Sequence, residues 1–307
     1  MAETVRGCTH ESGCHDGSLP TLASATVGAS AWLLVEYPGP WGSHVEEMTL
    51  PPAIRRAADR ARAAGVRTQL IRRPLRRGER RGPATPFQVY VGHSAGGEPW
   101  LEGRALGALD DLDALDLEAV AAGRRTGLGP EVTEPVLLVC THAQRNACCA
   151  RLGRPLAQHL REGHGDLVWE TTHVGGDRFA GNLVCLPHGL YYGALAPAFA
   201  DQAVAAYRKG EVCLERLRGR SGRPEAAQAA EHFVREHTGL MGLSEVVVER
   251  LNCGDTLSDA TVRAAAQRFS VTVQKVICPP PCASGGKGGI MSYRLAGMAV
   301  VAPAAFA

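Results

Sequence analysis

The chain has 307 residues and a formal net charge of +2, and 45% of its residues are hydrophobic and 21% charged. This composition is typical of a folded globular protein and excludes global disorder. A charge so close to zero gives no overall field that would favour nucleic acid or a membrane surface as the partner. No run approaches the ~20 apolar residues that span a bilayer, and the polar N-terminus lacks the apolar core of a secretory signal. We therefore expect a cytoplasmic protein.

The first half of the chain predicts the element order β–α–β–β–α. Apolar runs of strand length occur at Ala31–Glu36, Val66–Ile71 and Phe87–Val91. A helix rich in alanine and arginine is predicted at Pro52–Ala64, and a second helix at Leu109–Ala122 has apolar residues at helical spacing.

Two segments without regular periodicity divide the chain. Residues 1–26 are rich in small and polar residues and are predicted to be a flexible leader. A linker at 123–133 separates the first run of elements from a second run. At roughly 100–200 residues per domain, the length suits two domains. We place them at 27–130 and 131–307.

The second half restarts the alternation of strands and helices, which argues for an α/β fold. Its predicted elements are a strand at Pro135–Val139, a helix at Cys148–Leu160, a strand at Leu167–Thr171, a hairpin at Asn182–Leu186 and Leu190–Tyr192, helices at Ala200–Arg208 and Glu225–His237, and a strand-rich tail at Glu245–Leu251, Thr261–Ala265 and Ser270–Ile277. Proline is best tolerated in the first helical turn, so Pro155 favours a late start of the first of these helices.

Ten cysteines are many for a protein of a reducing compartment, where clustered cysteines indicate metal or redox chemistry. The sharpest cluster follows two predicted strands: Cys140 and Cys149 come after the first, and His173 after the second. Loops at strand ends of an α/β sheet gather at one edge, where ligands usually bind. Gly175 and Gly176 allow the backbone to approach a bulky group. Thiolates with a nitrogen ligand suit an iron–sulfur cluster or zinc.

This part of the chain resembles the sucrase/ferredoxin-like family of thioredoxin-like [2Fe–2S] proteins. The resemblance covers roughly residues 30–250 and is carried by four segments: WLLVEYPGPWG (32–42), CTHAQRNACCARLGRPLA (140–157), HVGGDRFAGNLVCLPHGLYYG (173–193) and LRGRSGRPEAAQAAE (217–231). It implies that the second half is a thioredoxin-like domain carrying an iron–sulfur site. The similar element order of the first half suggests a degenerate thioredoxin-like domain, so we expect two such domains in tandem.

The family's ligand pattern, carried over, assigns Cys140 and Cys149 to one iron and His173 to the other. The fourth position falls on Asp177, where the family leads us to expect a second histidine. A carboxylate is harder and more anionic than imidazole and lowers the reduction potential. Cys148 or a different group are the alternatives for this position. The implied function is single-electron transfer by a ferredoxin-like carrier, a redox module rather than a hydrolase, which would need a redox partner protein.

Residues around these ligands are assigned supporting roles. They are His142, Arg145, Cys148, Gly175, Gly176, Arg178 and Asn182. His142 either donates to a cluster sulfur or is a turn histidine bonded to backbone. For Arg145 and Arg178 three roles are open: offsetting the charge of a cluster, docking an acidic partner protein, or lying on the solvated surface without a specific role. Asn182 is expected to shape its loop by local hydrogen bonds.

Three other functions compete with the electron carrier. A structural zinc protein could use the same four residues, because zinc accepts those ligands equally well. A cofactor-free thioredoxin-like binding protein is the second alternative. A thiol–disulfide oxidoreductase would use Cys-x2-Cys at a helix start, whereas seven residues separate Cys140 from Cys148.

The remaining cysteines and the basic segment carry weaker signals. Cys185 and Cys213 are expected to be small buried hydrophobes. Cys278 and Cys282 could form a redox disulfide or half of a zinc site with Cys253, but a structural role is favoured. Cys8 and Cys14 are assigned to the leader. The arginine-rich segment 72–82 is expected to be a solvated surface loop.

Overall fold

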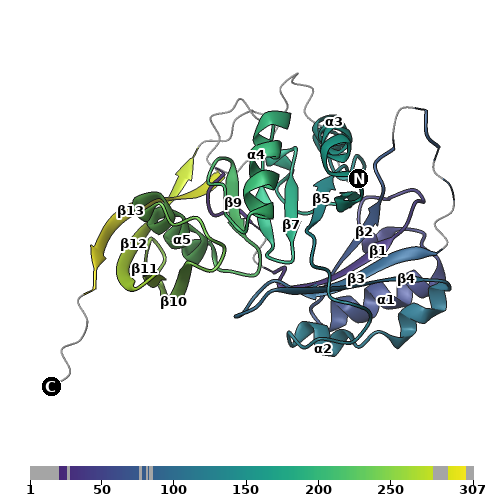
Figure 1. Cartoon of the computed structure of the whole chain (residues 1–307), viewed down its shortest axis with the longest axis horizontal. Coiled ribbons are helices and arrows are strands. Elements are labelled where there is room, and N and C mark those ends of the chain that lie inside the picture. Colours follow the sequence, from purple (N-terminus) through teal and green to yellow (C-terminus); the bar gives the residue numbers. More distant parts are fainter. Residues whose placement is uncertain are drawn as a thin grey trace, which may run out of the picture.

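The computed structural model describes residues 21–25, 28–75, 78–80, 82, 86–278 and 290–301. The predictions for Cys8, Cys14 and Cys282 lie outside this range. Two sheets organise the chain: a mixed sheet of nine strands and an antiparallel sheet of four (Figure 1). The predicted α/β class is confirmed at this level, whereas the tandem thioredoxin-like arrangement stays a prediction. No helix among the described residues is long and apolar enough to cross a membrane.

Four strands of the large sheet come from the first half of the chain, in the order β4-β3-β1-β2. They are β1 (Ala31–Glu36), β2 (Arg67–Arg72), β3 (Phe87–His93) and β4 (Trp100–Leu106). β4 has no counterpart among the predicted strands, because Glu102 and Gly103 interrupt its apolar pattern. In the fold Glu102 is buried and accepts from the backbone N–H groups of Thr126 and Leu128 at 3.2 Å.

The helices of the first half are α1 (Pro52–Ala63) and α2 (Leu117–Ala121), with 3₁₀ turns at Val45–Glu47 and Leu109–Ala114. The single predicted helix at Leu109–Ala122 is therefore wrong. The 3₁₀ segment ends at Ala114, and Asp116 caps α2, because its side chain accepts from the Ala119 N–H at 2.9 Å.

The second half adds five strands, in the order β6-β5-β7-β8-β9. They are β5 (Val136–Cys140), β6 (Val168–Thr171), β7 (Leu183–Leu186), β8 (Leu190–Tyr192) and β9 (Leu217–Arg220). β5 and β6 are parallel, which brings their carboxyl ends to the same edge. β9 has no counterpart among the predicted strands, because two of its four residues are arginines, although all four are buried.

One sheet unites the two halves of the chain, since β2 pairs antiparallel with β6. The junction is short, with Ile71 opposite Thr171 and Arg72 opposite Glu170. The Arg72 guanidinium pairs with Glu170 at 2.8 Å and stacks 3.7 Å from the Trp41 ring centroid. The first residue of the predicted basic surface loop is therefore fixed between the halves rather than solvated.

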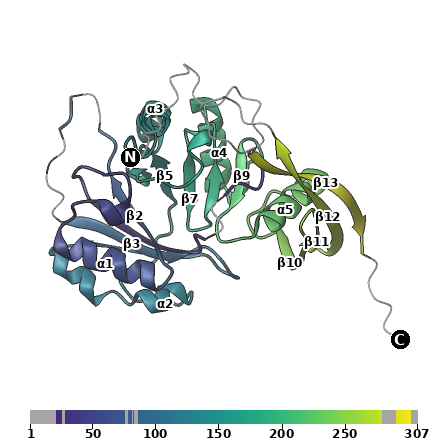
Figure 2. The same cartoon turned by 180° about the vertical axis from the view of Figure 1, so that it is seen from behind.

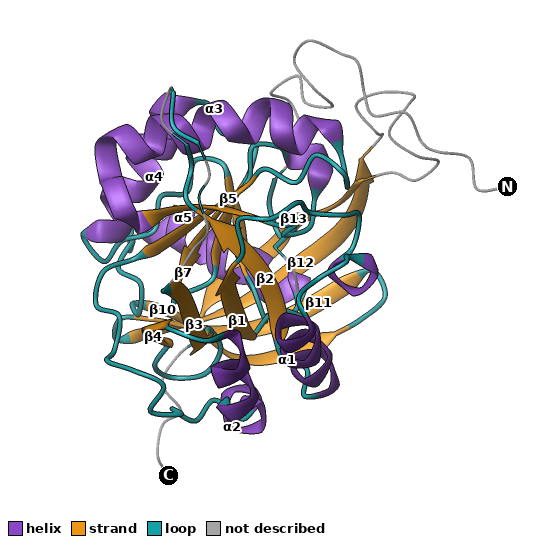
Figure 3. Cartoon of the chain, turned by 90° about the vertical axis from the view of Figure 1, so that its right-hand side faces the viewer, coloured by secondary structure: helices purple, strands orange, loops and turns teal. Residues whose placement is uncertain are grey.

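The longer helices of the second half are α3 (Ala147–His164), α4 (Pro197–Arg208) and α5 (Glu225–Thr238), and short 3₁₀ turns lie at Gly165–Leu167 and Asp177–Phe179. The predicted late start of α3 is wrong: the Asn146 side chain caps the helix by accepting from the Cys148 N–H at 2.8 Å, and Pro155 lies inside it. α1 and α2 pack on the part of the large sheet made of β1–β4, and α3 and α4 pack on the same face of the part made of β5–β9. Because the sheet curls, the two pairs of helices lie on opposite sides of it in the view of Figure 3.

The tail forms the second sheet, from β10 (Val246–Cys253), β11 (Leu257–Ala264), β12 (Gln267–Cys278) and β13 (Ile290–Val300). β10, β11 and β12 correspond to the three strands predicted in the tail, whereas β13 corresponds to no predicted strand. α5 covers this sheet, and both lie at the end of the molecule opposite β1–β4 (Figures 1 and 2).

Candidate metal centre

Three side chains with metal-ligand atoms meet at one edge of the large sheet. Cys140 is the last residue of β5, Cys149 lies in the first turn of α3, and His173 follows β6. One ligand atom from each lies within 4.8 Å of the other two, and both cysteines are buried. The parallel pairing of β5 and β6 explains the meeting, because it places Cys140 opposite Thr171, two residues before His173.

Gly153 lets α3 pack closely enough on β5 to bring Cys149 to Cys140. A Cβ atom on Gly153 would lie 2.0 Å from the backbone oxygen of Cys140, a distance that no packed side chain reaches. Only glycine therefore fits at this contact, even though glycine weakens a helix by roughly 0.5–1 kcal/mol relative to alanine.

We expect Gly153→Ala to lower the free energy of unfolding by about 1–3 kcal/mol, the cost of overpacking a tight contact. Gly163 on the same helix is the matched control, because a Cβ there meets nothing within 4 Å. Gly163→Ala is expected to stabilise the protein by ~0.5–1 kcal/mol. Chemical denaturation followed by circular dichroism measures both changes. Equal effects of the two substitutions would contradict the close packing of α3 on β5.

The two buried thiols share their protons unequally. The hydrogen bond from Cys149 holds the pKa of Cys140 well below its usual range, and His173 acts in the same direction, although burial opposes both. The same hydrogen bond, together with burial, raises the pKa of Cys149. The pair therefore carries its first negative charge on Cys140, the state that a metal ligand requires.

His142 has a structural role between the loops. Its Nδ1 accepts from the backbone N–H of His173 at 3.0 Å, and its Nε2 donates to the carbonyl of Gly42. Burial lowers the pKa of His142 and keeps the ring neutral. This agrees with the turn-histidine alternative, since both ring nitrogens are engaged by backbone. The backbone of His142, rather than its ring, supports the charge on Cys140.

His173 is held through its backbone, and its side chain hydrogen-bonds the Cys140 thiol. Arg67 donates to its carbonyl at 2.9 Å, while its N–H donates to His142. Its Nδ1 is buried and has no hydrogen-bond partner among the described residues. An orphaned buried nitrogen beside two thiols is costly unless a bound ion or cluster accompanies it, so the donor set fits a metal group.

The remaining predicted site residues fall into different places. Asp177 is not one of the three residues whose ligand atoms lie together. Its carboxylate accepts a hydrogen bond from the Asn146 side chain at 2.7 Å, beside the start of α3. Cys148 is buried in the apolar cluster under the sheet, and the Arg151 guanidinium lies 3.8 Å from its sulfur. Asn182 shapes its loop as expected, donating to the Gly176 carbonyl at 3.0 Å.

Other predicted residues lie apart from the three donors. Cys185 is fully buried and Cys213 half-buried. Cys253 and Cys278 belong to no such cluster of potential metal ligands among the described residues. Arg178 lies in the 3₁₀ turn Asp177–Phe179 that follows the two glycines.

Arg218 on β9 was missed by the sequence analysis. It is 1% exposed, and it donates to the Gly175 carbonyl at 3.0 Å and to Asn182 Oδ1 at 2.8 Å. A Cβ on Gly176 would lie 2.2 Å from its guanidinium, so this glycine is required for the contact. Burial lowers the pKa of Arg218 to about 10, and Cys140 and Cys149 favour its charge. A buried cation thus supports the loop that follows His173.

The local sequence gives little indication that Arg218 is buried. Arg218 stands between Leu217 and Gly219 in a four-residue strand, and so short a pattern with charged residues is equally typical of an exposed segment.

Comparisons with known proteins agree with the motifs that carry this site. A family model described as sucrase/ferredoxin-like matches residues 22–219, which is more than half of the chain and includes all three clustered donors. Comparison with curated proteins and with solved structures gave no match.

Proposed function

The chain is a member of the sucrase/ferredoxin-like family, and we propose that it binds a [2Fe–2S] cluster and transfers single electrons. The observation that carries this proposal is the meeting of Cys140, Cys149 and His173 within 4.8 Å in a buried setting. Soft thiolates with an imidazole are a donor set suited to iron–sulfur chemistry. As an electron carrier, the protein would act with a redox partner protein. The proposed location of this carrier is the cytoplasm.

In this proposal Cys140 and Cys149 would hold one iron, and His173 and Asp177 would hold the other. Asn146 would orient the Asp177 carboxylate through their 2.7 Å hydrogen bond, and the same Asn146 caps α3. The bound cluster would supply one-electron oxidation and reduction. The chain supplies the charge balance: Asp177 adds negative charge, which lowers the potential, and the buried Arg218 opposes that effect.

A structural zinc site is the second candidate, and one observation favours it. Three donor atoms that all lie within 4.8 Å of one another also suit a single tetrahedral ion, whose bonds are about 2.0–2.3 Å long. The two functions differ in the metal, in sulfide content and in colour.

We expect the wild-type protein, purified without air, to be red-brown and to contain about two iron and two acid-labile sulfide ions per chain. Asp177→Ala is expected to lower the iron content, because it removes the fourth ligand. Iron, zinc and sulfide analysis with a visible absorption spectrum makes the measurement. A colourless protein with one zinc per chain and no sulfide would establish the zinc alternative. Unchanged iron content in Asp177→Ala would remove Asp177 from the ligand set.

A further inference from the structure

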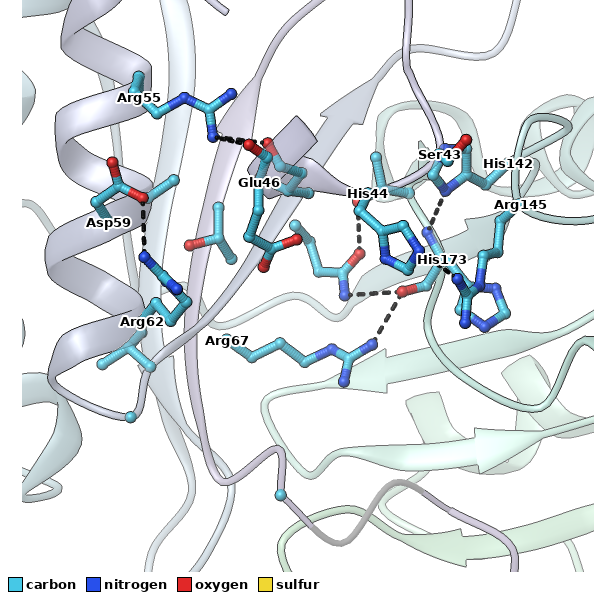
Figure 4. A pocket seen from close by; sticks show the side chains of 18 residues that line it. Ser43, His44, Glu46, Arg55, Asp59, Arg62, Arg67, His142, Arg145 and His173 are labelled. Atoms are coloured by element: carbon cyan, nitrogen blue, oxygen red, sulfur yellow. Dashed lines mark hydrogen bonds and ion pairs between the residues drawn. The ribbon is translucent and has the colours of Figure 1, made fainter. Parts of the chain in front are cut away.

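A cleft of about 370 Å³ opens directly beside the candidate metal centre (Figure 4). α1 supplies one wall, with Arg55, Asp59 and Arg62. Residues His142, Arg145 and His173 supply the opposite wall. The volume falls within the range of about 300–1,000 Å³ that is usual for small-molecule sites, near its lower end.

The charged groups of this cleft are mostly cationic. Four arginines line it, Arg55, Arg62, Arg67 and Arg145, against the two carboxylates Glu46 and Asp59. Arg62 pairs with Asp59 at 3.4 Å in an exposed and therefore weak contact. The other three arginines bond only carbonyl oxygens and a histidine ring among the described residues, so no carboxylate is paired with them.

Each of those three cations is positioned by a neutral partner. Arg55 donates to the backbone carbonyls of Val45 and Glu46 at 3.0 and 2.9 Å. Arg67 donates to the carbonyl of His173, and Arg145 donates to the ring of His44. Fixed guanidinium groups without carboxylate partners are suited to binding oxyanions, because their planar forks match carboxylate and phosphate geometry.

One further polar atom in the lining has no partner. Thr68 Oγ1 is buried and makes no hydrogen bond among the described residues. A buried hydroxyl without a hydrogen-bond partner is uncommon in native proteins, and it indicates that a ligand or a water molecule supplies the missing hydrogen bond.

We propose that this cleft binds a small organic or inorganic dianion through Arg67 and Arg145, with Thr68 donating a further hydrogen bond. Arg67 holds the carbonyl of His173, so the occupied cleft would lie against the same loop that presents the candidate metal ligand. The proposal does not depend on which metal occupies the neighbouring centre.

Calorimetric titration of the full chain at low salt tests this proposal with two dianions, succinate and inorganic phosphate, and with neutral succinamide. We expect saturable binding of at least one dianion, weakened about tenfold or more in Arg67→Gln and in Arg145→Gln, since charge-assisted hydrogen bonds are the strong ones. Arg154→Gln is the matched control, because Arg154 is an exposed arginine of α3 outside the cleft. The tighter of the two dianions identifies carboxylate or phosphate as the recognised group.

Three results would overturn the proposal: no saturable binding of either dianion, binding that persists in both cleft variants, or equal binding of succinamide. Circular dichroism confirms that each variant is folded. Metal analysis of the same samples separates a loss of the cleft from a loss of the neighbouring metal centre, since a failure of the cluster proposal leaves the dianion titration unaffected.

Discussion

Cys149→Ser is expected to reduce the bound iron by more than about tenfold, an effect at least as large as that of losing an outer-shell partner. Serine replaces the sulfur with a hydroxyl oxygen, which is a harder ligand and stays protonated at neutral pH, so the variant lacks a soft anionic ligand at this position. The side chain keeps a similar size, which limits the change in packing at this buried position in the first turn of α3.

Cys148→Ser is the matched control for this prediction. Cys148 is the neighbouring residue, is equally buried, and is not among the three donors that meet. We expect it to retain iron and sulfide. If Cys148→Ser loses the metal while Cys149→Ser keeps it, the two cysteines have the opposite roles. The thermal midpoint of each variant, measured by circular dichroism, shows whether the loss of metal arises from unfolding.

Glu231→Gln is expected to have the largest effect on stability, about 3–5 kcal/mol, because it leaves buried cations without their counter-charge. The Glu231 carboxylate on α5 accepts from Arg220 at 2.9 Å, Arg223 at 2.8 Å and Arg235 at 3.0 Å. These contacts join β9 to α5, and Arg235 also donates to the carbonyls of Leu240 and Gly242 at 3.0 Å.

Acid should remove the same contribution from the wild-type protein. Burial on its own would raise the pKa of Glu231, but the three arginines outweigh it and lower the pKa from 4.5 to about 2. A lowered pKa gives a stabilisation that is fully present above the unfolded value of 4.5. It is lost as the pH falls through the folded value, and it amounts to about 3 kcal/mol.

Urea denaturation at pH 7 and at pH 3 measures this contribution. The gap in unfolding free energy between wild type and Glu231→Gln should be large at pH 7 and narrower at pH 3. Glu249→Gln on β10 is the control, because Glu249 pairs with Arg268 at the surface, where solvent screens the pair. A gap that is independent of pH, or a Glu231→Gln protein as stable as wild type, would contradict the role of the carboxylate.

The sequence predicted most of the regular elements because their apolar periodicity survives in the fold. The predicted strand at Ala31–Glu36 is β1, and the predicted hairpin is β7 and β8. Strands that carry charged or small residues in buried positions were missed, as Glu102 in β4 and Arg218 in β9 show. Burial of these groups depends on partners distant in the chain, which no local pattern contains.

The sequence also predicted which three donors of the candidate site lie together, because these residues stand at the ends of recognisable elements. Cys140, Cys149 and His173 could be identified because each follows or begins a recognisable element, and the parallel pairing of β5 with β6 brings them together. The side chain of Asp177 was harder to place, because its orientation is set by Asn146 on a different segment. The predicted helix at Cys148–Leu160 begins within one residue of α3, whereas the late start near Pro155 is wrong because the side chain of Asn146 caps the helix.

The short junction between β2 and β6 limits how the chain can be divided. A fragment ending near residue 130 would expose the edge of β2, and its complement would expose the edge of β6. Unpaired strand edges recruit other strands and promote aggregation. Thr172, which accepts from the Leu70 N–H at 3.1 Å across this junction, directly precedes His173. Separating the two halves would therefore remove a contact that holds the loop presenting the imidazole of His173.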